Sequence, residues 1–87
     1  MKIYKYALTL DAKQEIVAPI KKILDIQMQD GCPVLWALID ESEDEKTYQI
    51  TMAGTGFDTV TKADMYLGTV QMGMCVWHYF LSEVIER

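Results

Sequence analysis

His78 is the only histidine in this 87-residue chain, and imidazole is the side chain best suited to acid–base or metal chemistry near neutral pH. Catalysis by a histidine needs a nucleophile and an orienting group beside it, and a common zinc site needs three or four ligands. Cys32 and Cys75 are the further candidate ligands. Cys75 and His78 are three residues apart in an expected strand, which places their side chains on opposite faces. We therefore predict no metal, no cofactor and no catalytic residue, and we expect that the protein is not an enzyme.

Two glycines flank Thr55 in the segment Gly54-Thr55-Gly56, which follows a strand-like run and precedes a polar loop. A dinucleotide-binding fingerprint needs a third glycine and a following helix, and a Walker loop needs a lysine followed by serine or threonine. The segment has neither pattern. Two interpretations remain open: a turn that requires positive φ, or a concave nest of backbone N–H groups that binds an anion.

Large aromatic side chains could complete a binding site around this segment. Trp36 and Trp77 are able to anchor either a hydrophobic core or a planar ligand. His78 is either a strand residue in a hydrogen bond or a polar contact inside a ligand pocket. The ligand-binding residues that we predict are Trp36, Gly54, Thr55, Gly56, Trp77 and His78.

Length and charge limit the classes of partner. The 87 residues predict a single β-rich domain spanning residues 1–87. A domain of this size buries only about 60% of its unfolded surface, so we expect a homo-oligomer in which a partner subunit adds stability. The formal net charge of −5 argues against duplex DNA or RNA as a partner. No apolar run reaches the roughly 18–20 residues of a membrane span, so we expect no membrane association.

The first half of the chain alternates between apolar and polar residues, which is typical of half-buried strands. This pattern predicts strands over Ile3–Leu10 and Ile23–Gln29. Glu15–Ile20 is a short apolar piece containing Pro19, which suits an edge strand or a connection. Asp30-Gly31 predicts a tight hairpin turn, although Pro33 suggests a loop longer than two residues.

The middle of the chain contains the best candidate for a central strand. Val34–Ile39 is apolar on both faces, as expected of a strand that is covered on two sides. Asp40–Glu45 carries five acidic residues and predicts a solvated turn. Thr47–Ala53 alternates again and predicts the next strand.

The second half contains one long apolar run, Tyr66–Leu81, which exceeds an average strand. Gly73 near its middle predicts a bulge or bend that splits it into two strands. A helix over Val76–Glu86 is the competing interpretation, and the loop Asp58–Asp64 has room for one helical turn. In total we predict a mostly β fold of six or seven antiparallel strands, forming a small sandwich or barrel, with at most one short helical segment.

Several segments form a pattern along most of the chain: Lys2–Tyr6, Gln27–Gly31 with Pro33 and Leu35–Asp40, Gly54–Gly56 and Tyr66–Met72. Together they resemble a family of short phage-encoded proteins known only as a domain of unknown function. Family members more often have His-Pro after the glycines, where this chain has Phe57-Asp58. The resemblance implies a viral origin and a location in the host bacterial cytoplasm. It supplies no reaction and no functional residues.

Small phage proteins that lack catalytic residues commonly act by binding host molecules, and one class sequesters the nucleotide signals of bacterial immunity. We therefore expect a non-enzymatic accessory protein that binds and sequesters a small nucleotide-like signal. The alternative is a protein–protein interaction module that inhibits or adapts a host or virion protein through an apolar sheet face or an exposed edge. A third hypothesis is a hydrolase that acts on such a signal.

Overall fold

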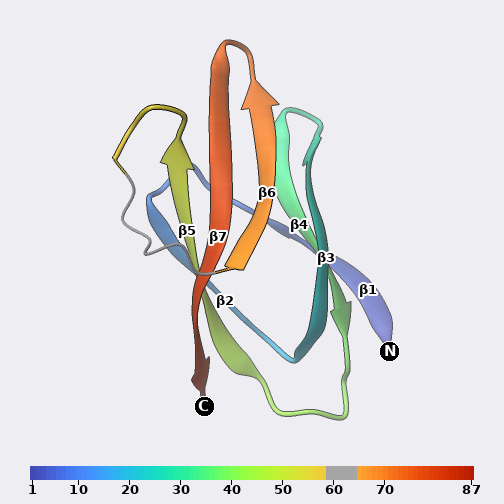
Figure 1. Cartoon of the computed structure of the whole chain (residues 1–87). Helices are drawn as coiled ribbons and strands as arrows, with labels where there is room; N and C mark the ends of the chain where they lie inside the picture. Colours follow the sequence, from blue (N-terminus) through green and yellow to red (C-terminus); the bar gives the residue numbers. More distant parts are fainter. Residues whose placement is uncertain (59–64) are drawn as a thin grey trace.

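The computed structural model describes residues 1–58 and 65–87, and every regular element in these residues is a β-strand (Figure 1). The helical turn that we expected within Asp58–Asp64 lies almost entirely outside the described residues. The strands are β1 (Lys2–Ala7), β2 (Lys13–Ala18), β3 (Ile20–Gln29), β4 (Cys32–Ile39), β5 (Lys46–Gly54), β6 (Met65–Met72) and β7 (Cys75–Glu86).

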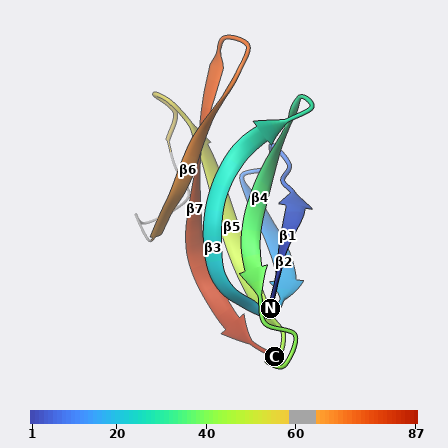
Figure 2. The ribbon, with the colours of Figure 1, turned by 90° about the vertical axis from the view of Figure 1, so that its right-hand side faces the viewer.

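The strands form two antiparallel sheets. One sheet has three strands in the order β1-β4-β3, and the other has four strands in the order β2-β5-β7-β6. Figure 2 shows the β3–β4 and β6–β7 hairpins as separate layers, which identifies the fold as a sandwich. The prediction of a mostly β, antiparallel domain with up to seven strands is confirmed.

Alternation along the strands fills the space between the sheets. In β4, Leu35 and Ala37 are fully buried and Trp36 between them is half-buried, so this central strand directs its odd-numbered side chains inward. In β7, Tyr79 is fully buried, and its hydroxyl donates a hydrogen bond to the carbonyl of Thr9 at 2.9 Å. Full burial of an aliphatic or aromatic side chain stabilises the fold by about 1.5–3 kcal/mol. The other core side chains are Leu8, Ile16, Ala18, Ile26, Ile39, Ile50, Met52 and Val70.

Two hairpins have their turns where glycine allows positive φ. Asp30 and Gly31 have φ values of 51° and 81° and form the whole loop between β3 and β4. The suggestion of a longer loop is wrong, because Pro33 lies within β4 and pairs with Met28. Gly73 has a φ of 61° and separates β6 from β7, as predicted. The helix considered for Val76–Glu86 is also wrong, because these residues belong to strand β7.

The first strand ends earlier than the alternation suggested. β1 stops at Ala7. Leu8 lies opposite Pro33 in the same ladder and donates its N–H to the carbonyl of Pro33 at 2.9 Å, but Pro33 has no N–H to return the bond. The hydroxyl of Thr9 then donates to the Asp11 carboxylate at 2.9 Å. The chain thereby leaves the three-stranded sheet and enters β2, which is an edge strand of the other sheet.

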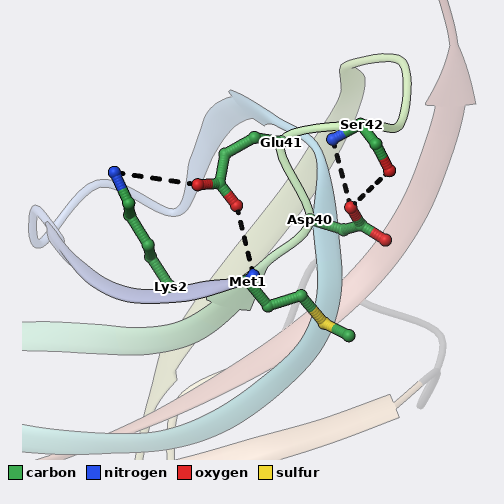
Figure 3. Close-up of polar contacts among 5 residues, drawn as sticks. All are labelled: Met1, Lys2, Asp40, Glu41 and Ser42. Atoms are coloured by element: carbon green, nitrogen blue, oxygen red, sulfur yellow. Dashed lines mark hydrogen bonds and ion pairs between the residues drawn. The ribbon is translucent and has the colours of Figure 1, made fainter.

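The acidic turn Asp40–Glu45 carries the chain from β4 back to the four-stranded sheet. The carboxylate of Asp40 accepts hydrogen bonds from the Ser42 hydroxyl at 2.6 Å and from the Ser42 N–H at 3.1 Å (Figure 3). These two bonds hold the pKa of Asp40 below its usual value. Glu41 forms ion pairs with the Met1 amino group at 3.6 Å and with Lys2 at 3.7 Å. Such exposed pairs contribute little stability, so the turn is shaped chiefly by Asp40.

Candidate functional site

His78 lies on the face of the four-stranded sheet that points away from the core, next to the buried Tyr79 in β7. Its Nε2 is 2.6 Å from the hydroxyl oxygen of Thr55, and its Nδ1 is 2.9 Å from the hydroxyl oxygen of Thr69. The Thr69 hydroxyl is in turn hydrogen-bonded to the Tyr66 hydroxyl. We refer to these four side chains (Tyr66, Thr69, His78 and Thr55) as the hydroxyl chain. The interpretation of His78 as a hydrogen-bonded strand residue is confirmed, and its contact with a ligand stays a prediction.

The segment Gly54–Phe57 is a β-turn. The N–H of Phe57 donates to the carbonyl of Gly54 at 3.1 Å, and Gly56 has the positive φ of 83° that a type II turn requires at its third position. The N–H of Thr55 donates to the carbonyl of Val76 at 3.1 Å. Because the N–H groups of Thr55 and Phe57 are both engaged, the turn interpretation fits this segment better than the anion nest.

Gly54 allows two aromatic rings to approach the turn closely. A Cβ atom at this position would lie 2.9 Å from the Trp77 ring and would overlap the Phe57 ring. Trp77 pairs with Gly54 across the sheet and packs against the core from the inner face. The structure therefore brings together Gly54, Thr55, Gly56, Trp77 and His78 at one end of the four-stranded sheet.

Trp36 does not join this group. It lies in β4, opposite Lys5 and Asp25, on the outer face of the three-stranded sheet. The ammonium of Lys5 is 5.9 Å from the centre of the Trp36 ring, within the range of a cation–π contact. Trp36 thus belongs to a different surface from the other five predicted residues.

A hollow of about 350 Å³ opens beside the turn, and we call it the turn-end hollow. Phe57 is 70% exposed at its edge. Within residues 1–58 and 65–87, its lining residues are Thr55, Phe57, Met74, Cys75, Val76 and Trp77, and none of these is an acid, a lysine or an arginine.

A larger cleft of about 640 Å³ lies at the opposite end of β7, and we call it the lysine cleft. It is lined by the edge strand β3 of one sheet and by residues of β5, β6 and β7 of the other. The hydroxyl of Tyr48 donates to the carbonyl of Ile20 at 2.9 Å and joins the two sheets there. Its lining residues are Ile20, Lys21, Lys22, Ile23, Leu24, Asp25, Lys46, Tyr48, Met65, Tyr66, Leu67, Leu81 and Val84.

Positive charge is concentrated at this cleft. Lys21, Lys22 and Lys46 line it, although the whole chain has only 8 lysines and arginines. The one acid among its lining residues in the described chain, Asp25, accepts hydrogen bonds from the Ile26 N–H at 2.8 Å and from Gln27 at 2.7 Å. Lys46 is paired with Glu86 at 3.3 Å. The cleft therefore combines apolar walls with three lysines. Lys21 and Lys22 lie outside any described ion pair, and Lys46 forms an exposed ion pair with Glu86.

Irregularities in strand pairing gather around the same cleft. Lys21 and Leu24 are extra residues in β3, and Leu67 is an extra residue in β6; all three line the cleft. Ser82 is an extra residue in β7, between Leu81 and Glu83. β-bulges redirect side chains and are frequent next to functional sites, so their position marks the lysine cleft as a candidate binding site.

Sequence reasoning did not select the lysine cleft. The available signal was Lys21-Lys22, the only adjacent pair of basic residues in the sequence. Lys46 is distant in sequence and joins the pair only because β5 and β3 come close through the packing of two sheets.

The two cysteines and the acids do not form a described metal site. Cys32 and Cys75 are both exposed free thiols. Within residues 1–58 and 65–87, no group of three or more histidine, cysteine, aspartate and glutamate side chains is placed to hold a metal ion. The same residues contain no helix that is long and apolar enough to cross a membrane.

These features define a small antiparallel β-sandwich with a lysine-lined cleft at one end and the turn-end hollow at the other; the hydroxyl chain runs from Tyr66, which lines the cleft, to Thr55, which lines the hollow. Residues 1–86 match the family described as "Domain of unknown function (DUF7352)". The chain belongs to this family, which confirms the resemblance to a family of unknown function. No curated protein and no solved structure matches the chain.

Proposed function

We propose that the protein binds a small nucleotide-like ligand in the lysine cleft and releases it unchanged. The observation that carries this proposal is the combination of apolar walls with Lys21, Lys22 and Lys46 around one cleft. Its volume of about 640 Å³ lies within the roughly 300–1,000 Å³ of known small-molecule sites. A nucleotide has both parts that such a cleft can bind, a planar apolar base and an anionic phosphate.

The two parts of the ligand would contact different walls. The base would lie against the apolar side chains of the inner sheet face, chiefly Leu81 and Val84. The phosphate would lie at the mouth, where Lys21 and Lys22 are exposed. A second phosphate would compete with the Glu86 carboxylate for Lys46.

Local charge can outweigh the net charge of −5 because salt screens distant charges. At physiological ionic strength the screening length is about 8 Å, so a bound phosphate responds mainly to the lysines beside it. The acidic turn is close enough to matter: a smaller hollow of about 330 Å³ is lined by Lys21 and Lys46 together with Asp40, Glu43 and Asp44. These acids weaken the attraction of the lysines for an anionic ligand.

Two features of the cleft support binding over chemical conversion. The carboxylate of Asp25 is engaged by two hydrogen bonds, and the hydroxyl of Tyr48 is engaged by the carbonyl of Ile20. Neither group is therefore free to transfer a proton to a ligand in this arrangement. In a phage protein in the host bacterial cytoplasm, as the resemblance implies, such binding would sequester a nucleotide signal of host immunity.

Exposed apolar side chains favour a second candidate function, a protein–protein interaction module, and also the expected homo-oligomer. Ile3 and Tyr4 are 60% and 45% exposed on the edge strand β1, where a partner strand could pair. Phe57 and Met74 are 70% and 100% exposed at the other end of the molecule. Light scattering of the purified protein would show whether these surfaces join copies of the chain.

Calorimetry with a panel of cyclic and linear nucleotides tests the binding proposal. We expect Lys22→Gln to weaken binding roughly three- to tenfold, because it removes a charge-assisted contact. Lys13→Gln is the matched control, since Lys13 is exposed on β2 and does not line the cleft. Equal weakening in both variants, or no binding by the unchanged protein, would refute the proposal.

Recovery of the ligand separates binding from catalysis. After incubation and heat release, mass spectrometry should return the nucleotide intact. Recovery of hydrolysis products would instead support the hydrolase hypothesis. Capture of a host or virion protein in stoichiometric amount, without nucleotide binding, would support the interaction module.

A further inference from the structure

The hydroxyl chain has two alternative arrangements of protons. A neutral histidine carries one N–H, so one ring nitrogen of His78 donates a hydrogen bond and the other accepts one. The two nitrogens face the hydroxyls of Thr55 and Thr69 at 2.6 and 2.9 Å. Because a hydroxyl has one proton and can also accept, the tautomer of His78 sets the direction of every bond in the chain.

In the first arrangement, Nε2–H of His78 donates to the Thr55 oxygen. The Thr69 hydroxyl then donates to Nδ1, and the Tyr66 hydroxyl donates to the Thr69 oxygen. The proton of Thr55 is left free for a new acceptor. In the second arrangement all three bonds reverse, and the free proton is that of Tyr66. The tautomer therefore decides which end of the chain can donate to a ligand.

The Thr55 end of the chain meets the turn-end hollow, since Thr55 is one of its lining residues. Phe57 and Trp77 provide aromatic surface in the same hollow, and Gly54 keeps both rings close to the turn. Among the residues that the structure describes, no acid, lysine or arginine lines the hollow, so its described walls offer no charge to bind a phosphate. Its chemistry suits a flat apolar molecule that carries one hydrogen-bond acceptor.

We infer that the turn-end hollow is a second binding site, for a neutral planar aromatic ligand whose acceptor receives the Thr55 hydroxyl proton. His78 is a positioning residue, because its Nε2–H tautomer holds the Thr55 oxygen and leaves the Thr55 proton available. This inference goes beyond the proposed function, since the hollow and the lysine cleft share none of their described lining residues.

A matched pair of ligands tests the inference. Quinoline and naphthalene have nearly the same shape, and only quinoline has a ring nitrogen that accepts a hydrogen bond. In NMR titrations of the full chain, we expect quinoline to shift the amide signals of Thr55, Phe57 and Trp77. We expect it to bind roughly three- to tenfold more tightly than naphthalene, as one hydrogen bond allows. Equal affinities, or shifts confined to the lysine cleft, would overturn the inference.

Two substitutions of Thr55 by residues of similar size test the contribution of its hydroxyl group to ligand binding. Thr55→Val removes the proton donor and keeps the shape, so the preference for quinoline should disappear. Thr55→Ser keeps the donor and should keep the preference. A preference that survives in Thr55→Val would overturn the role of Thr55.

The ring nitrogens of His78 give a readout that needs no substitution. Their ¹⁵N chemical shifts distinguish the two tautomers in the unchanged protein. Saturation with quinoline should raise the population of the Nε2–H tautomer, whereas naphthalene should leave it unchanged. A tautomer population that does not respond to quinoline would overturn the positioning role of His78.

Discussion

Replacing Tyr79 by phenylalanine should lower stability near neutral pH and raise it, relative to the unchanged protein, in strong alkali. Tyr79 is fully buried, and its hydroxyl donates to the carbonyl of Thr9 at 2.9 Å. Loss of this hydrogen bond should cost about 1 kcal/mol of unfolding free energy near pH 8. The same burial raises the pKa of Tyr79 to about 12, from an ordinary value of 10.0.

The sign of the alkaline effect follows from the two pKa values. The folded protein has the higher pKa, so the unfolded chain loses the Tyr79 proton first as the pH rises. The stabilising contribution of the protonated Tyr79 is therefore fully present below about pH 10, and it is lost as the pH rises towards the pKa of Tyr79 in the folded protein. At up to about 1.4 kcal/mol per pH unit, the loss reaches about 2 kcal/mol near pH 11.5. Phenylalanine has no proton to lose, so the Tyr79→Phe variant escapes this loss.

Urea unfolding followed by circular dichroism, in buffers from about pH 8 to about pH 11.5, measures both proteins. The variant should be about 1 kcal/mol less stable at the lower pH and about 1 kcal/mol more stable at the upper one. Burial also raises the pKa of Tyr6, but that contribution is common to both proteins and cancels in the difference. A difference in stability that stays constant across this range would refute the reasoning.

Three further substitutions test the cleft, the turn and the core. Glu86→Gln should strengthen nucleotide binding about two- to fivefold in calorimetry, because it frees Lys46 from an exposed ion pair; weaker binding would contradict this. Gly54→Ala should lower the urea unfolding free energy by about 1–3 kcal/mol, since its methyl group would overlap two aromatic rings; a neutral effect would mean that the rings move aside without cost. Leu35→Ala should cost about 2–5 kcal/mol because the side chain is fully buried, whereas Leu24→Ala, 43% exposed, should cost less than half as much.

The strands could be predicted from the sequence because their two faces meet different environments. Val34–Ile39 gave a different signal, since it is apolar on both faces; this predicted a central strand, and the structure places it in the centre of the three-stranded sheet. Gly73 separates two strands because its φ of 61° suits a tight turn. The end of β1 could not be predicted, because Leu8 continues the alternation and only the structure shows that the residue opposite it is Pro33, which has no N–H to extend the ladder.

Part of the candidate site could also be predicted. Thr55 and His78 are 23 residues apart in sequence and share a hydrogen bond, and both were selected for their chemistry. Trp36 was selected for the same reason and lies on the other sheet, because residue type carries no information about which sheet a strand joins. The lysine cleft was missed since it depends on how the two sheets separate.

The irregular positions in the strands explain why period-two reasoning could not find the cleft. If Ser82 were an ordinary strand position and not an extra residue, strict alternation from Leu81 would point Glu83 inward and Val84 outward. The structure pairs Val84 with the buried Tyr48 instead, and Glu83 with Gln49 on the outer face. The Ser82 hydroxyl holds this irregularity by donating to the carbonyl of Gln49 at 3.1 Å.

The bulges affect the charge of the lysine cleft as well as its shape. A bulge at Ser82 gives the cleft an apolar wall at Val84 and keeps the Glu83 carboxylate off the lysine-lined side of the sheet. A second bulge at Lys21 shifts Lys22 to the position opposite Leu38, and both lysines line the cleft. An acidic chain can thus present a basic cleft, because a few extra residues in its strands decide which charges face the ligand.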